Sequence, residues 1–300
     1  FINGTADVDL VIVHNQPVDE IREIIGMTPE VTLDIHHIEQ SYYSPPRKVR
    51  KDPWIGSSLC FDPLLLYNKG HWFEFMQASV EAGFFSPEYV IHRSGLFLNE
   101  ARLLFTELEN QRNLGSSIYI SSYLKIIEDG CNAVACLSGL PLTDRTLMKR
   151  FNEVAEAINR EDLAPILYGL ILGQNSPFPY YDYFFNSWKY YLEYFGNSDL
   201  APLKMKADRI PYYTAPVSYY WNEHLASALW IMAKTWCSVA KAYQLDDNEY
   251  FVTFCNMLEI SPMFFAKRKS QLELFLDSIE DAQKNWGDSQ GFDANDLENL

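Results

Sequence analysis

Two aspartates near the start of the chain form the sequence pattern with the clearest chemical meaning. Asp7 and Asp9 are separated by one residue and lead into the apolar run 10–13. In a β-strand, residues two apart point to the same face, so the two carboxylates converge. Like charges held that close are unfavourable unless a cation neutralises them, and carboxylate oxygens suit Mg²⁺. The spacing therefore predicts a metal site at Asp7 and Asp9, with a solvated charge pair on an edge strand as the alternative.

Asp34 is the third acidic candidate. It lies in the segment 31–38, where apolar and polar residues alternate as in a second strand. A carboxylate flanked by apolar residues in a strand is costly without a function, and a neighbouring strand could bring it beside the first pair. His36 shares the predicted face of Asp34, whereas His37 points to the other face. The two histidines therefore cannot bind one ion, and we interpret both as structural.

The predicted elements that position these acids are mainly strands near the start of the chain and helices further along it. The pattern predicts strands over 8–13 and 31–38, with a short helix over 17–25 between them. From about Trp72 the apolar period becomes helical, with a break at Gly83 and Ser86-Pro87 and an N-cap signal at Thr143-Asp144. Further helices are predicted over 118–137, 144–158, 163–172, 180–195, 223–243 and 271–284.

These elements predict an α+β fold in which a small mixed β-sheet domain is followed by an all-helical domain. The expected division is 1–110 for the sheet domain, 111–285 for the helical domain and 286–300 for an acidic tail that frays. Aromatic stretches at 180–185 and 212–221 lie in the helical half. They could stack a base or a sugar, or they could serve as core or as a homodimer contact.

One basic segment stands out in an acidic chain. A Ser-Pro-Pro sequence at 44–46 precedes four basic residues within 47–51, and its prolines predict a loop outside any helix or sheet. Lys48 and Arg50 of this loop could bind nucleotide phosphates, the alternative being a solvated loop.

Composition narrows the classes of protein. The net charge of −16 disfavours general nucleic-acid binding and anionic membranes, and it suits a cationic small molecule. No apolar run is long enough to span a membrane. The five cysteines include no C-x-x-C pair, so we expect buried reduced thiols and a cytoplasmic protein.

The acidic motifs together resemble a known family. The run Gly4–Val13, followed by Leu33–Ile35, is similar to the nucleotidyltransferase superfamily of the DNA polymerase beta type, and most to the kanamycin and minimal nucleotidyltransferases. The segment Leu64–Gly70 resembles the family's apolar stretch before its first helix, with Asn68 in place of the usual Asp. The family's Gly-Ser loop would fall before Phe1, so we expect the N-terminal Gly-Ser part of the domain to be missing from this chain.

The resemblance implies an activity and roles for residues. Asp7 and Asp9 would hold Mg²⁺ on the phosphates of ATP or another NTP, and Asp34 would complete the metal site or accept the proton of the attacking hydroxyl. Glu100 and Glu107, seven residues apart on one helix face, are the candidate general bases.

The implied reaction is transfer of a nucleoside monophosphate, AMP from ATP, to a hydroxyl of a small molecule such as an aminoglycoside-like antibiotic. Two alternatives remain open. One is an inactive or antitoxin-type binding module that uses the aromatic helices as its partner surface. The other is nucleotidylation of a protein or of an RNA end.

Overall fold

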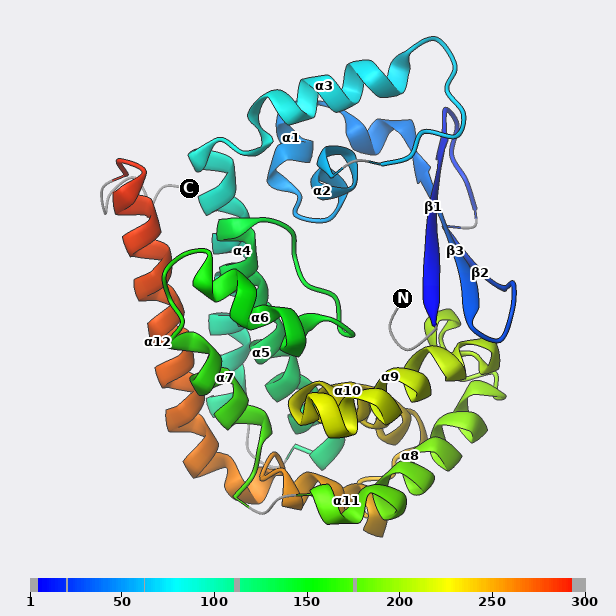
Figure 1. Cartoon of the computed structure of the whole chain (residues 1–300), viewed down its shortest axis with the longest axis vertical. Coiled ribbons are helices and arrows are strands. Elements are labelled where there is room, and N and C mark those ends of the chain that lie inside the picture. The colour runs from blue at the N-terminus through cyan, green and yellow to red at the C-terminus, as the bar shows by residue number, and fades with distance from the viewer. Residues whose placement is uncertain (1–4, 20, 62, 111–113, 175–176, 293–300) are drawn as a thin grey trace.

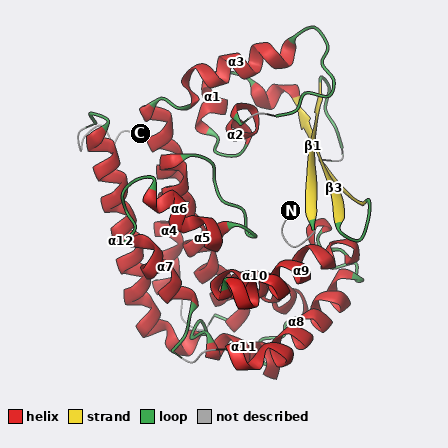
Figure 2. Cartoon of the chain, viewed as in Figure 1, coloured by secondary structure: helices red, strands yellow, loops and turns green. Residues whose placement is uncertain are grey.

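A small β-sheet and a large set of helices make up the computed structural model of the chain (Figure 1), which describes residues 5–19, 21–61, 63–110, 114–174 and 177–292. The strands are β1 (Ala6–His14), β2 (Arg22–Gly26) and β3 (Val31–Glu39). The α-helices are α1 (Pro46–Lys51), α2 (Ile55–Cys60), α3 (Trp72–Phe84), α4 (Pro87–Asn110), α5 (Ser116–Ser138), α6 (Leu147–Glu156), α7 (Leu163–Ile171), α8 (Tyr181–Gly196), α9 (Ile210–Glu223), α10 (Leu225–Tyr243), α11 (Glu249–Met257) and α12 (Phe265–Ser289). The predicted α+β layout, with a mixed sheet, is confirmed (Figure 2).

The sheet has the order β1-β3-β2, with β1 parallel and β2 antiparallel to β3. Both predicted strands are confirmed, but the predicted helix over 17–25 is wrong because Arg22–Gly26 forms β2. A turn in which Thr28 Oγ1 accepts the backbone N–H groups of Glu30 and Val31 joins β2 to β3. Pairing along β3 satisfies the backbone groups of β2, whose neighbouring isoleucines also favour a strand over a helix.

The proline-containing segment 44–51 is the second correction. Residues Pro46–Lys51 form α1, with the proline in the first turn, where its missing N–H removes no helical hydrogen bond. Arg50 extends from α1 to α3, where its Nη2 and Nε donate to the carbonyls of Ser79 (2.6 Å) and Val80 (3.2 Å). The basic segment therefore holds two helices together and is not a free loop.

Most of the predicted helices are confirmed to within a few residues, but α2, α9 and α11 were missed. Helix α9 contains Pro211 in its first turn and Pro216 in its interior, and α11 is only 9 residues long. Prolines and short length both weaken the helical pattern in a sequence. The N-cap of α6 is Thr146 and not Thr143-Asp144.

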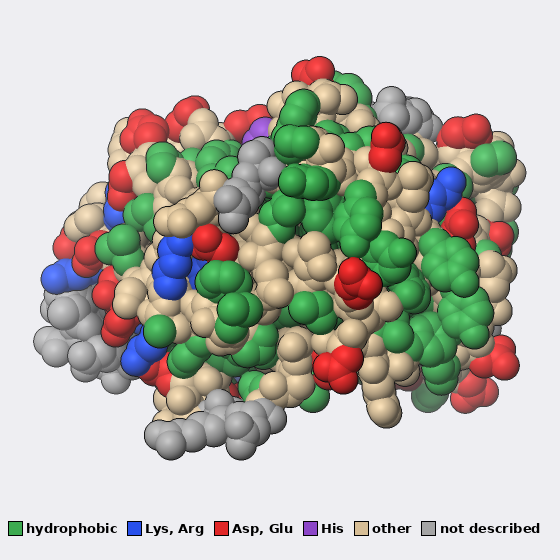
Figure 3. Space-filling view, turned by 90° about the horizontal axis from the view of Figure 1, so that it is seen from below, with side chains coloured by type: hydrophobic (Ala, Val, Ile, Leu, Met, Phe, Trp, Pro, Cys, Tyr) green, Lys and Arg blue, Asp and Glu red, His purple; other side chains and the backbone are tan. Residues whose placement is uncertain are grey.

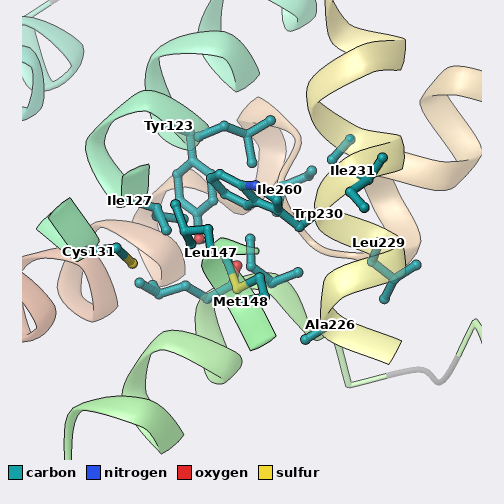
Figure 4. Close-up of a cluster of buried hydrophobic side chains, with 14 of the residues drawn as sticks. Tyr123, Ile127, Cys131, Leu147, Met148, Ala226, Leu229, Trp230, Ile231 and Ile260 are labelled. Atoms are coloured by element: carbon teal, nitrogen blue, oxygen red, sulfur yellow. Dashed lines mark hydrogen bonds between the residues drawn. The ribbon is translucent and has the colours of Figure 1, made fainter. Parts of the chain in front are cut away.

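The helices enclose one large core, part of which is shown in Figure 4. Tyr123, Ile127, Leu147 and Trp230 there come from α5, α6 and α10, and all four are fully buried or nearly so. Helix α4 packs on this core beside α5, where Ser94 Oγ donates to the carbonyl of Ala133 (2.8 Å). The division of the chain near residue 110 stays a prediction.

The structure also bears on the predictions about the cysteines, the acidic tail and membrane-spanning segments. Four of the cysteines are buried, as expected: Cys131, Cys136, Cys237 and Cys255. The predicted acidic tail begins inside α12, which continues to Ser289, and 293–300 lie outside the described residues. Within the described part of the chain, no helix combines the length and apolarity that a membrane crossing requires.

Candidate metal centre

Strand register brings Asp9 and Asp34 together. The two residues are direct partners in the parallel pairing of β1 with β3, and Asp7 is paired with Thr32 one pleat earlier. Direct partners on neighbouring strands project from the same face, so Asp7, Asp9 and Asp34 share one side of the sheet. This is the arrangement that the acid spacing predicts.

A possible set of metal ligands within this face consists of Asp9, Asp34 and His36. One donor atom from each of these residues lies within 4.8 Å of the others. His36 Nε2 is also 3.3 Å from Asp34 Oδ1. The roles of Asp7, Asp9 and Asp34 in metal binding stay predictions, and the geometry adds His36, which we had interpreted as structural.

Asp34 is held by an arginine from the neighbouring strand. Arg22 donates from Nε to Asp34 Oδ1 (2.9 Å) and from Nη2 to Asp34 Oδ2 (2.5 Å), a bidentate pair. Burial of Asp34 acts to raise its pKa. The hydrogen bonds and charge of Arg22, helped by His36 and Arg209, outweigh burial and lower that pKa. Asp34 is thus an ionised carboxylate with a strong partner, which suits a ligand better than a proton acceptor.

Asp7 is held from the other half of the chain. Arg209 Nη1 donates to Asp7 Oδ1 and, at 2.9 Å, to Thr32 Oγ1, while Thr32 itself donates to Asp7. Arg209 ends the 3-10 helix Ala207–Arg209, just before α9, and its side chain is only 4% exposed. The acidic face therefore also fixes the helical region to the sheet.

Asp9 differs from the other two aspartates because its carboxylate makes no ion pair with any described residue. It is exposed, yet partial desolvation and the negative charges of Asp7 and Asp34 raise its pKa. Further along the same face, Val13 and Ile38 pack against the apolar cluster of α1 and α3. The face is thus covered at both ends and open in the middle, at Asp9 and His36, where an ion could enter.

The remaining predicted site residues lie elsewhere. Glu100 and Glu107 are exposed on α4, across the molecule from the strands (Figure 1). The charge of Glu100 acts on Asp129 of α5. Lys48 is exposed on α1, and no described contact joins it or Arg50 to the acidic face. The structure thus brings neither candidate base and neither candidate phosphate ligand to Asp9.

The aromatic stretches divide between the core and the surface. Phe184 and Trp188 of α8 are fully buried, whereas Tyr190 and Tyr194 of the same helix are about 60% exposed (63% and 61%). Hydrophobic side chains, including tyrosines, gather on the lower face of the molecule (Figure 3). A homodimer contact through these aromatic residues stays one of the predicted alternatives.

Sequence reasoning missed the arginines of this site. Arg22 lies in the segment predicted as a helix. Only when this segment is assigned as a strand does it follow that the Arg22 side chain points to the opposite face from those of Ile21 and Glu23. Arg209 is 202 residues from Asp7 in the chain, and no local pattern connects them. Comparison of the chain with protein-family models, curated proteins and solved structures finds no match.

Proposed function

We propose that the chain is a nucleotidyltransferase that transfers a nucleoside monophosphate, AMP from ATP, to a hydroxyl of a small molecule. The observation that supports this proposal most is the in-register pair Asp9 and Asp34, with Asp9 unpaired and open to solvent. Two convergent carboxylates that carry excess negative charge are the ligand type that Mg²⁺ prefers. The sequence resemblance to nucleotidyltransferases rests on the same residues.

In this proposal the residues of the acidic face have separate roles. Asp9, Asp34 and His36 would hold the ion, and Asp7 lies on the same face of the sheet. A bound Mg²⁺ would offset negative charge on the nucleotide phosphates. The substrate hydroxyl forms a new O–P bond at the α-phosphorus as the bond to pyrophosphate breaks, and its proton passes to solvent water, because neither Glu100 nor Glu107 lies near Asp9. Asp34 serves as a ligand because Arg22 keeps it ionised.

The acceptor is proposed from charge. The chain carries a net charge of −16, and a negative field raises the local concentration of a polycation. An aminoglycoside-like molecule offers both the positive charge and the hydroxyl groups. If kanamycin causes no pyrophosphate release while other hydroxyl compounds do, the proposed aminoglycoside-like acceptor is wrong, but nucleotidyl transfer remains the proposed reaction.

The direct test is Mg²⁺-dependent binding of ATP, measured by calorimetry, in the wild type and in Asp9→Asn. We expect the substitution to weaken binding by at least about tenfold, because Asp9 is the one of the three aspartates on this face that makes no ion pair with a described residue. The matched control is Asp199→Asn, which removes one exposed carboxylate after α8 and should leave binding unchanged. Equal ATP affinity in Asp9→Asn and wild type would contradict the proposal.

A binding module without catalysis is the second candidate. The observation in its favour is that Arg22 and Arg209 already neutralise two of the three acids. Such a protein would hold its fold through these pairs and would need no ion. It predicts ATP affinity that does not depend on Mg²⁺ and no pyrophosphate release with any hydroxyl acceptor.

A further inference from the structure

Two arginines from separate segments are stacked on one tyrosine beside the acidic face. The guanidinium carbon of Arg145 lies 3.8 Å from the centre of the Tyr212 ring, and that of Arg209 lies 3.9 Å from it. Two guanidinium groups at this distance on the same face of the ring would overlap. The two arginines therefore lie on opposite faces of Tyr212. Arg145 belongs to the loop 139–146, and Tyr212 lies in the first turn of α9.

Arg145 is a buried cation without a negative partner. It is 6% exposed, and its hydrogen bonds to described residues go to neutral groups. Nη2 donates to Thr5 Oγ1 (2.9 Å) and to the Thr5 carbonyl (3.3 Å), and the guanidinium also hydrogen-bonds the Tyr212 side chain. No described ion pair joins it to a carboxylate, since the neighbouring Asp144 side chain lies 3.4 Å from Lys234 instead. A buried charge is costly unless an opposite charge compensates it.

The pair also has unused donors. The Nε atoms of Arg145 and Arg209 are buried and have no hydrogen-bond partner. Nη1 of Arg145 makes none of the described hydrogen bonds. Planar guanidinium donors of this kind match phosphate oxygens.

The position of the pair relates it to the candidate metal centre. Arg209 contacts Asp7, which precedes Asp9 by two residues, or about 7 Å along the strand. Arg145 contacts Thr5 at the beginning of the same strand. A chain of phosphates that starts at Asp9 and runs toward the beginning of β1 would thus meet both arginines.

We propose that Arg145 and Arg209, separated by Tyr212, bind the outer phosphates of a polyphosphate ligand. This inference extends the proposed function, because it assigns the phosphate-binding residues to the loop 139–146 and α9 in place of Lys48 and Arg50. The anion supplies the negative charge that Arg145 lacks. Arg209 shares its guanidinium between Asp7 and the ligand.

The test uses inorganic tripolyphosphate and the full chain in magnesium-free buffer, with affinity measured by calorimetry. We expect the wild type to bind and Arg145→Gln to bind at least about tenfold more weakly, since it loses a charge-assisted contact. The control is Arg102→Gln, which alters an arginine paired with Asp277 and Glu280 between α4 and α12, and its affinity should equal that of the wild type.

Three outcomes overturn the proposal: no binding by the wild type, equal affinity in Arg145→Gln, or an equal loss in Arg102→Gln. If Arg145→Gln fails to fold, Arg145→Lys replaces it. This variant keeps the charge but loses the planar fork, so we expect severalfold weaker binding, and wild-type affinity would count against the proposal.

A parallel titration with ATP and Mg²⁺ separates this inference from the proposed function. Loss of both ligands in Arg145→Gln supports a nucleotide source for the polyphosphate, and loss of tripolyphosphate alone indicates a free polyphosphate site. If Asp9→Asn leaves ATP affinity unchanged while Arg145→Gln abolishes tripolyphosphate binding, the proposed function fails and the phosphate site stands.

Discussion

The molecule contains two clusters of acidic side chains that are neutralised in different ways. On the sheet, Asp34 is paired with Arg22 and Asp7 with Arg209, which is 202 residues away in sequence. Asp9 forms no ion pair with a described residue. The contacts that neutralise this cluster therefore also join the sheet to the helical region.

The second cluster lies between α5, α10 and the loop 139–146. Lys234 Nζ is 2.7 Å from Glu128 Oε2 and 3.4 Å from Asp144 Oδ1. Asp129, one residue after Glu128, receives Lys125 Nζ from the preceding turn of α5 at 2.6 Å. Each of these acids forms an ion pair with a lysine. None of the residues 125, 128, 129 and 144 belongs to the sheet.

The difference shows how a site that can bind a ligand may be told from a structural one. In the helical cluster, every acid forms an ion pair with a lysine, although Asp129 Oδ2 and Asp144 Oδ1 are buried without a hydrogen bond. On the sheet, one carboxylate is unpaired and exposed, and a nearby arginine, Arg145, is buried without a counter-ion. Uncompensated charges of both signs along one strand are costly for folding, and a bound cation and anion would remove that cost.

The largest expected effect separates the two clusters by stability. Arg209→Gln should lower the free energy of unfolding by about 3 to 5 kcal/mol, because it leaves Asp7 without its buried partner. Urea denaturation followed by tryptophan fluorescence measures this change. The comparison variant is Arg102→Gln, whose partners Asp277 and Glu280 are about half exposed and whose loss should cost no more than about 1 kcal/mol. Similar costs for the two variants would mean that the sheet is not fixed through Arg209.

The second prediction concerns pH and the helical cluster. Burial raises the pKa of Asp129 from 3.8 to about 6, despite the hydrogen bond from Lys125 and its charge. Between these values the folded state binds more protons than the unfolded state, so the contribution of Asp129 to stability falls as pH rises and is fully lost above about pH 6.

Asp129→Asn removes this dependence. Relative to the wild type, the variant should gain most of about 3 kcal/mol between pH 4 and pH 7, the amount that corresponds to the change in pKa of Asp129. Denaturation at several pH values measures the difference, and Asp199→Asn controls for the loss of one exposed charge. A constant difference between Asp129→Asn and wild type across this range would show that Asp129 is ionised without penalty.

How far the sequence predicts this molecule depends on the range of the interactions. Alternation predicts β1 and β3, and the two-residue spacing predicts the shared face of Asp7 and Asp9, because both follow from strand geometry alone. The position of Asp34 opposite Asp9 needs the register, which depends on the whole sheet. The short strand β2 was predicted as a helix because an apolar run of five residues is too short for its period to separate the two.

The partners of the acids were beyond local patterns. Arg209 and Arg145 come from the helical part of the chain, and their sequence neighbours show no charge pattern that links them to strands. Glu100 and Glu107 were chosen as bases because they share a helix face, yet their helix, α4, lies across the molecule from the strands (Figure 1). Spacing within a helix says which residues share a face, and only packing says where that face points.

The third prediction tests whether His36 belongs to the ion site. An imidazole favours Zn²⁺ more than Mg²⁺, which prefers oxygen ligands. His36→Gln should therefore weaken Zn²⁺ binding by about tenfold and change Mg²⁺ binding much less. Competition with a chelating dye measures both affinities. His71→Gln is the control, because His71 is 92% exposed and pairs with Glu74 at the start of α3. Equal losses for the two metals, or the same loss in His71→Gln, would remove His36 from the site.

The smallest expected effect has the opposite sign from most substitutions. Desolvation and the charges of Asp7 and Asp34 raise the pKa of Asp9, so its ionised form is unfavourable in the folded state above that pKa. In a buffer without divalent ions at neutral pH, Asp9→Asn should therefore stabilise the protein by up to about 1 kcal/mol, the range for exposed charges. Urea midpoints with and without Mg²⁺ measure this, and Mg²⁺ should stabilise only the wild type, because a ligand stabilises the state that binds it. Destabilisation by Asp9→Asn in the absence of an ion would mean that Asp9 has a structural partner, and the contrast between the two acidic clusters would then disappear.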